Sequence, residues 1–202
     1  MQCRETLKIN QAGHLEIGGC DTVDLAKQYG TPLYVMDEAY IRNVCAGYTA
    51  TLDSVYPDYK VCYASKAFST KAIYAIMREE GLGADVVSGC ELKTALAGGM
   101  DADSIYFHGN NKLPEELAEA VKAGVHAVVI DSFYEMTLLN EIAAQKNKRQ
   151  SVMVRVNPGI DAHTHHFVQT SRVDSKFGFS IADGTAQKAI ETIGTFENLS
   201  FV

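Results

Sequence analysis

The sequence predicts an α/β fold built on a parallel sheet, and three observations lead to that prediction. Strand-like runs alternate with helical patterns from Thr31 onward, as a series of βαβ units requires. The predicted strands begin at positions 33, 60, 84, 104, 127 and 152, so the unit repeats every 20 to 27 residues. No G-x-G-x-x-G loop follows the first strand, and we therefore expect a (β/α)₈ barrel rather than an open doubly wound sheet.

The first thirty residues precede this alternation and differ from it. Leu7–Asn10 and His14–Ile17 predict a hairpin around a Gln-Ala-Gly turn. Asp21–Tyr29 predicts a short helix with an aspartate as its N-cap and a glycine at its end. The sequence therefore predicts an N-terminal segment, residues 1–30, and a barrel domain, residues 31–202.

Within the barrel domain each predicted strand is followed by a predicted helix. The strand-like runs are Leu33–Met36, Lys60–Ser65, Ala84–Val87, Ser104–His108, Ala127–Asp131 and Val152–Asn157. The helical patterns are Glu38–Val55, Lys71–Glu80, Glu91–Ala97, Pro114–Ala123, Phe133–Gln145 and Gly184–Ile193. A seventh strand begins at Leu199, and the sequence stops at Val202. Since such a barrel takes about 250 residues, we expect an incomplete barrel of six βα units.

Composition narrows the class of protein. The chain has 202 residues, 47% hydrophobic and 21% charged, which is ordinary for a globular protein. A formal net charge of −7 without a basic stripe argues against a nucleic-acid partner. No apolar run approaches the roughly 20 residues of a membrane span. Five scattered cysteines without a C-x-x-C pair suggest reduced thiols and a cytoplasmic location.

Lys66 is the strongest candidate for chemistry. The apolar run Val61–Ala64 leads into it, and a small-residue turn and a helix follow, so it is expected where a strand ends. Ligands bind at that end of the strands in parallel α/β folds. A lysine held partly desolvated there could attack a carbonyl and form a Schiff base. The alternative is an ordinary solvated loop lysine.

Other polar residues interrupt or end the predicted strands. Asp85 and Arg155 lie within apolar runs, and Glu91 follows the loop after Asp85. Buried charges are costly unless paired, so these three are expected to meet one another or a ligand, or to form an ion pair that only ties strands together. His108 and Asn110 follow the fourth strand, where they could contact a ligand or form only a tight turn.

Two other kinds of site find little support. His163, His165 and His166 cluster in a polar loop, but no helical carboxylate–histidine spacing accompanies them, and we expect no metal site. Serine-nucleophile chemistry is not expected either, because the sequence contains no G-x-S-x-G elbow.

Five ordered motifs resemble one family. They are Y-A-S-K-A (63–67), G-A-D-V-V-S-G-C-E-L (83–92), H-G-N-N-K (108–112), R-V-N-P-G (155–159) and S-K-F-G (175–178). Together they are similar to diaminopimelate decarboxylases, which are fold-type III pyridoxal-phosphate enzymes. The resemblance implies an alanine-racemase-like barrel and a β-domain to which residues 1–30 contribute.

The resemblance also implies the function. Lys66 would carry pyridoxal 5'-phosphate, with Asp85 and Arg155 as cofactor-binding residues and Glu91, His108 and Asn110 lining the site. The full-length protein would decarboxylate meso-2,6-diaminopimelate to L-lysine and would be a homodimer. The ring-stacking histidine and the phosphate loop are expected beyond Val202, so the 202-residue chain alone is expected to be inactive.

Two alternatives stay open at this point. One is a related decarboxylase of a basic amino acid, of the ornithine or arginine type. The other is a non-catalytic pyridoxal-phosphate-binding barrel protein, which would have no use for the leading β-domain segment.

Overall fold

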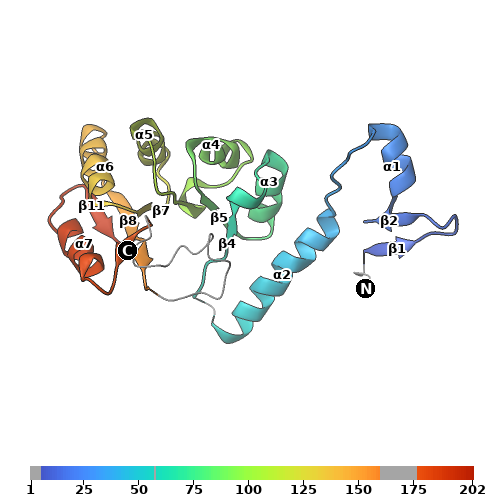
Figure 1. The fold of residues 1–202 in the computed structure, drawn as a ribbon, viewed down its shortest axis with the longest axis horizontal. Coiled ribbons are helices and arrows are strands. Elements are labelled where there is room, and N and C mark those ends of the chain that lie inside the picture. Colours follow the sequence, from blue (N-terminus) through green and yellow to red (C-terminus); the bar gives the residue numbers. More distant parts are fainter. Residues whose placement is uncertain (1–5, 57, 160–176) are drawn as a thin grey trace. The chain divides into compact units, whose positions relative to one another are not determined.

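The computed structural model describes residues 6–56, 58–159 and 177–202, and the chain divides into two compact units, Met1–Val61 and Cys62–Val202. The N-terminal unit contains β1 (Leu7–Ile9), β2 (Leu15–Ile17), β3 (Cys20–Asp21), α1 (Thr22–Tyr29) and α2 (Glu38–Val55), all but β3 labelled in Figure 1. The boundary expected after residue 30 remains a prediction.

The predicted hairpin and short helix are both confirmed in the N-terminal unit. β1 pairs antiparallel with β2, with Leu7 opposite Ile17, and β2 pairs with β3. α1 begins after Asp21, whose side chain accepts hydrogen bonds from the first-turn amides, and ends at Gly30 with φ of 81°. These capping residues explain why local sequence alone located this segment.

The strand predicted at 33–36 is wrong, because residues 33–37 form no regular secondary structure and follow a bend at residues 31–32. Tyr34 is 97% exposed, and Met36 is 53% exposed. An apolar run becomes a strand only when a neighbouring ladder pairs its backbone, and none of the described residues supplies one here. The helix that follows, α2, begins and ends at the predicted residues.

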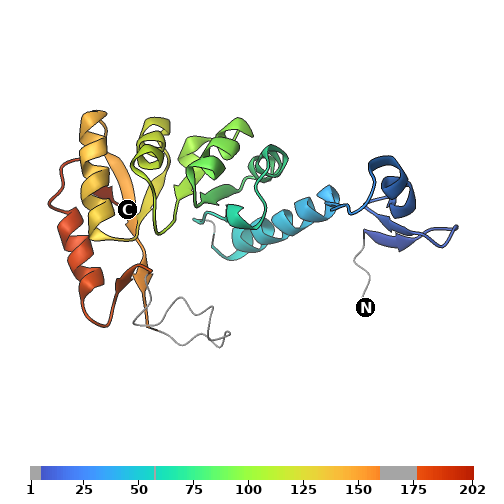
Figure 2. The same cartoon turned by 45° about the horizontal axis from the view of Figure 1, so that its top comes forward.

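The C-terminal unit contains the repeated βα elements (Figures 1 and 2). Its strands are β4 (Cys62–Ala64), β5 (Gly83–Val86), β6 (Ile105–Phe107), β7 (Ala127–Ile130), β8 (Gln150–Val154), β9 (Val156–Asn157), β10 (Phe179–Ser180) and β11 (Leu199–Phe201). Its helices are α3 (Lys71–Glu79), α4 (Gly89–Ala97), α5 (Pro114–Ala123), α6 (Phe133–Gln145) and α7 (Thr185–Ile193). Two short 3₁₀ turns, η1 (Ser65–Ala67) and η2 (Ala102–Ser104), complete it.

The main sheet has the strand order of a barrel. Its six strands are all parallel and run β11-β8-β7-β6-β5-β4, so each strand lies beside its predecessor in the series. A doubly wound sheet would reverse this order at a switch point. The described part of the chain thus has five βα units and a sixth strand, one unit fewer than expected, because residues 33–36 form no strand. β9 and β10 form a separate parallel pair.

Period-two alternation gives the sheet two different faces. In Figures 1 and 2, α3, α4, α5 and α6 lie side by side in one layer against the sheet. Val86, Phe107 and Ile130 share one face of the sheet by register and are fully buried, as expected for the face that the helices cover. Their neighbours Asp85 and Met153 belong to the opposite face and are partly or largely open. The helix-facing side of the sheet therefore holds the core.

Side-chain caps place the helices close to their predicted bounds. Thr70, Ser88 and Ser132 each accept a hydrogen bond from the backbone amide three residues later, at the starts of α3, α4 and α6. All six helices predicted in the barrel domain begin and end within two residues of the observed bounds. None of the helices in the described ranges is both long and apolar enough to cross a bilayer.

The polar cluster around Asp21 predicts acid sensitivity of the N-terminal unit. Hydrogen bonds from His14 first, and from backbone amides and Asn10, lower the pKa of Asp21 to about 2 from 3.8. A depressed pKa means that these bonds stabilise the fold above pH 3.8 and are lost as the pH falls through about 2. We expect the Asp21 carboxyl carbon to titrate by NMR near pH 2, with faster hydrogen exchange in α1 below it.

Two variants check the origin of this effect. Asp21→Ala should speed exchange of the Val23 and Asp24 amides at neutral pH, because both donate to Asp21. Asp24→Asn is the matched control, since the Asp24 carboxylate contacts only the exposed Lys27 among the described residues, and exchange of the two amides should stay unchanged. Equal acceleration in both variants would contradict the capping role of Asp21.

Candidate functional site

Most of the predicted site residues lie at the carboxyl ends of neighbouring parallel strands. Lys66 follows β4, Asp85 lies within β5, His108 follows β6 and Arg155 follows β8. Because the strands are parallel and in register, their carboxyl ends meet at one edge of the sheet. This edge of the C-terminal unit is the candidate functional site.

Lys66 lies in the turn that ends β4, as predicted. It belongs to η1, and the Tyr63 hydroxyl donates to the Phe68 carbonyl at 2.8 Å across the turn. Lys66 itself is exposed, so the partial desolvation considered for this lysine does not appear in the described structure. Ser65, directly before it, is only 1% exposed. The turn therefore joins a buried serine to an exposed lysine.

Asp85 and His108 form a pair on the open face of the sheet. Asp85 Oδ2 lies 3.7 Å from His108 Nδ1, which is too long for a good hydrogen bond. Asp85 Oδ1, His108 Nε2 and Ser65 Oγ are buried atoms without a hydrogen-bond partner among the described residues. Buried polar atoms normally have partners, so three such atoms at one sheet edge indicate where ligand atoms can bind.

Glu91 hydrogen-bonds within its own loop, and Asn110 is exposed to solvent. The Glu91 carboxylate accepts from the Val87 amide at 2.8 Å, and its own amide donates to Ser88 Oγ at the start of α4. Glu91 therefore orders the β5–α4 loop in this structure. Asn110 lies exposed in the bend after His108, where it is accessible from solvent.

Arg155 pairs with Asp131, not with Asp85 or Glu91 as the sequence suggested. Arg155 Nη1 lies 3.0 Å from Asp131 Oδ2, and the second Asp131 oxygen accepts from the Gly178 amide at 2.6 Å. The guanidinium also lies over the Phe177 ring, 4.5 Å from its centroid. Asp131 ends the strand-like run 127–131, and its side chain is 3% exposed. The structure thus gives Asp85 and Arg155 separate partners.

Sequence reasoning missed a buried ion pair beside the site. Lys112 Nζ lies 2.8 Å from Glu135 Oε1, and the two side chains are 1% and 6% exposed. Lys112 also donates to the backbone carbonyls of Gly109 and Val129. Burial lowers the pKa of Lys112 and raises that of Glu135, and each charge opposes the shift of the other. The lysine that ends the H-G-N-N-K motif was the available signal.

A second missed residue joins two loops at the same edge. Glu116, near the start of α5, accepts from the Gly89 amide at 2.6 Å with one oxygen and from the Leu113 amide with the other. A Cβ at Gly89 would lie 2.9 Å from Glu116 Cγ, so glycine permits this approach. The acidic residue at the third helical position was a capping signal in the sequence.

Some predictions fall elsewhere. His163, His165, His166 and the first two residues of the S-K-F-G motif lie outside the described residues. Among the described residues, no group of three or more His, Cys, Asp or Glu side chains could hold a metal ion.

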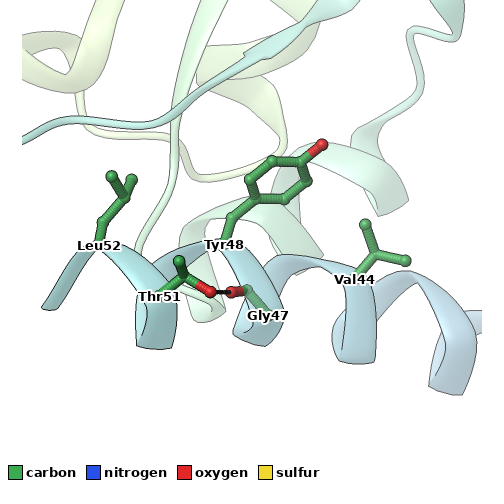
Figure 3. Close-up of a pocket in the computed structure, with 5 residues that line it drawn as sticks. All are labelled: Val44, Gly47, Tyr48, Thr51 and Leu52. Carbon is green, nitrogen blue, oxygen red and sulfur yellow. Dashed lines mark hydrogen bonds between the residues drawn. The ribbon is translucent and has the colours of Figure 1, made fainter. Parts of the chain in front are cut away.

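A cavity of about 420 Å³ lies on α2, in the N-terminal unit (Figure 3). Val44, Gly47, Tyr48, Thr51 and Leu52 line it, and none of them carries a charge at neutral pH. The Thr51 hydroxyl donates to the Gly47 carbonyl of its own helix at 2.7 Å. This cavity contains none of the predicted site residues, and we do not assign it to the candidate site.

Comparison with known proteins identifies the domain. Residues 42–202 match the family described as pyridoxal-dependent decarboxylase, pyridoxal binding domain. The chain is 49% identical over 186 residues to diaminopimelate decarboxylase of Bacillus methanolicus, and 45% identical over 197 residues to that of Bacillus subtilis. These matches cover 92% and 98% of this chain but 43% and 45% of the relatives. The chain thus spans less than half the length of these relatives.

Solved structures agree with this assignment. The structure of diaminopimelate decarboxylase from M. jannaschii in complex with L-lysine superposes with a TM-score of 0.87 at 34% identity. That match covers 98% of this chain and 46% of the other. Lysine/ornithine decarboxylase from Vibrio vulnificus, at 20% identity and a TM-score of 0.66, shares the fold. With its singly wound parallel sheet and the family match over residues 42–202, the chain belongs to the pyridoxal-dependent decarboxylases.

Proposed function

We propose that the full-length form, a protein of the relatives' length that contains these 202 residues, decarboxylates meso-2,6-diaminopimelate to L-lysine and carbon dioxide. The observation that carries this proposal is the strand-end edge, which holds an exposed lysine and three buried polar atoms that have no hydrogen-bond partner among the described residues. The relatives named diaminopimelate decarboxylase support the substrate. The lysine-bound structures of such relatives support a site for a diamino acid product.

The residues at the edge suit pyridoxal 5'-phosphate. An exposed primary amine can react with the aldehyde of the cofactor, and Lys66 supplies one. Asp85 Oδ1, His108 Nε2 and Ser65 Oγ have no hydrogen-bond partner among the described residues, and polar atoms of the cofactor can supply one. When bound, the cofactor withdraws the electrons that the departing carboxylate leaves behind.

The chain's own residues would bind the cofactor and orient it and the substrate. Lys66 would hold the cofactor covalently and exchange places with the substrate amine. Asp85 would accept a hydrogen bond at the cofactor. Arg155 is held by its hydrogen bond to Asp131 and by its contact with the Phe177 ring. Its guanidinium would therefore offer the cofactor a positive charge in a fixed orientation. Glu91, His108 and Asn110 would line the site.

The whole protein's setting is part of the same proposal. The full-length form would be a homodimer in the cytoplasm, with residues 1–30 contributing to a β-domain. Its partner in the reaction would be a small amino acid, without nucleic acid or membrane. The 202-residue chain alone should release no carbon dioxide from diaminopimelate, because it spans less than half the length of these relatives.

The function is tested by turnover. The full-length form with pyridoxal phosphate should release carbon dioxide from meso-diaminopimelate and form L-lysine in equal amount. Arginine, ornithine and lysine are tested separately as alternative substrates. Release from one of these with none from diaminopimelate would contradict the proposed substrate.

Lys66 should be the residue that holds the cofactor. Borohydride reduction of the full-length form with pyridoxal phosphate should fix the label on the peptide that contains Lys66, as measured by mass spectrometry. Lys66→Arg should abolish this label and the activity, because a guanidinium remains protonated and cannot react with the aldehyde. Lys71→Arg, five residues later at the start of α3, is the control and should label normally. A label on Lys60, Lys71 or Lys93 would refute the assignment.

Asp85 and Asp131 should respond in opposite ways to removal. Asp85→Ala should leave the urea midpoint of the cofactor-free protein unchanged or raised, because it removes a carboxylate with an unpartnered buried oxygen. It should nevertheless weaken pyridoxal-phosphate binding. Asp131→Ala should lower stability by up to about 3–5 kcal/mol, because it leaves the Arg155 charge and the Gly178 amide without their acceptor.

The two measurements separate a binding role from a structural role. Urea denaturation without cofactor gives stability, and titration with pyridoxal phosphate gives affinity. Equal destabilisation by both variants, with cofactor affinity unchanged by Asp85→Ala, would show that Asp85 serves the fold alone.

A further inference from the structure

The chain that leaves β6, residues 108–113 (the 108–113 loop), stays close to β5. The His108 amide donates to the Val86 carbonyl at 2.8 Å, so the β5–β6 ladder continues one residue beyond β6. Gly109 follows with φ of +120°, and a Cβ there would lie 3.0 Å from the Val87 carbonyl oxygen. A side chain would meet both backbone strain and this close approach, which explains the glycine.

On the other side of β6 the ladder ends earlier. The register between β6 and β7 ends at Phe107 and Val128. The Ile130 carbonyl accepts from the Arg155 amide, toward β8, and alternate carbonyls of a strand point to opposite sides. The Val129 carbonyl therefore points toward β6, at the level where that chain has turned toward β5. The two strands separate here and leave a backbone acceptor to be satisfied.

Lys112 satisfies the acceptors on both sides of this opening. Its ammonium donates to the Val129 carbonyl at 2.8 Å and to the Gly109 carbonyl at 2.6 Å. Glu135 Oε1, from α6, lies 2.8 Å away. The two carbonyls thus accept from two of the three N–H donors of the ammonium group, and the Glu135 carboxylate supplies its counter-charge. The side chain performs the joining role that the strand ladder performs elsewhere in the sheet.

We infer that Lys112 is a positioning residue of the proposed pyridoxal-phosphate site. Its ammonium holds the 108–113 loop to the end of β7, and the loop in turn keeps the His108 imidazole beside Asp85. This inference rests on the proposed function, since it assigns Lys112 a part in building that site. Lys112 does not touch the cofactor in this arrangement; it acts through Gly109 and His108.

Four variants of the full-length form test this inference. Lys112→Met removes the ammonium and leaves Glu135 buried without its counter-ion, so it should also lower stability. Lys112→Met/Glu135→Met removes both charges and should regain stability, because apolar side chains of similar volume often replace a buried ion pair without loss.

The other two variants are controls. Lys148→Met removes an ammonium that also donates to two carbonyls, those of Val121 and Lys122 at the end of α5, away from the 108–113 loop. Ile193→Ala removes a buried side chain of α7 and lowers stability without altering the loop.

The measurements are the urea midpoint of the cofactor-free protein, the dissociation constant of pyridoxal phosphate and the NMR shift of the Gly109 amide. Both Lys112 variants should weaken cofactor binding by about 10–100-fold and should shift the Gly109 amide. The double variant should keep these changes while its urea midpoint returns toward that of the wild type. Lys148→Met and Ile193→Ala should leave the Gly109 amide and the cofactor affinity unchanged.

Two results would overturn the inference. One is recovery of cofactor affinity in the double variant together with its stability. The other is a single relation between affinity and urea midpoint for all four variants, which would make Lys112 structural only. A wild type that binds pyridoxal phosphate but releases no carbon dioxide from diaminopimelate would contradict the proposed substrate alone, because cofactor affinity and the Gly109 shift are measured without turnover.

Discussion

Backbone groups at the carboxyl edge of the sheet lose their strand partners as the strands end, and charged side chains satisfy many of them. Lys112 donates to the Gly109 and Val129 carbonyls, and Glu116 accepts from the Gly89 and Leu113 amides. Glu91 and Asp131 accept from one amide each. Because unpaired buried backbone groups are costly, these side chains make an ordered edge possible. Each also ties a loop to its own strand or to a neighbouring element.

The polar groups of this edge fall into two classes. Asp131 and Glu116 accept a hydrogen bond with each carboxylate oxygen, and Lys112 donates to two carbonyls beside its counter-ion, so their contribution is to the shape of the loops. Asp85 and His108 retain buried atoms without hydrogen-bond partners in the described part of the chain and lie on the open face of the sheet. A fold tolerates such atoms where function requires them and where its other interactions stabilise them. The residues that order the loops are therefore different from those proposed to bind the ligand.

Lys66 lies at the same edge, in a turn that neighbouring residues hold in place. The Tyr63 hydroxyl braces its turn through the Phe68 carbonyl, and Thr70 begins the helix that follows. The lysine itself is exposed, which leaves its amine accessible to an aldehyde cofactor. Reactivity would then come from the place of the lysine at the strand-end edge more than from its burial.

The sequence by itself determined the helices, most of the strands and the position of Lys66 at a strand end. Caps such as Thr70 and Ser132, glycine stops and apolar periodicity act within a few residues, so they can be recognised without knowledge of the fold. The five motifs and their order along the chain indicated the family, also without knowledge of the fold. The failure at residues 33–36 has the converse cause, since strand propensity does not supply a partner strand.

Only the tertiary structure decided which charges meet. Arg155 pairs with Asp131, 24 residues away, and Lys112, in the loop after β6, pairs with Glu135 of α6. Such pairings depend on the register of neighbouring strands and on where each loop leaves the sheet. A shift of one residue in a strand would turn its side chains to the other face. Sequence spacing shows that Asp85 and Arg155 are both unusual, but only the three-dimensional register shows that they have different partners.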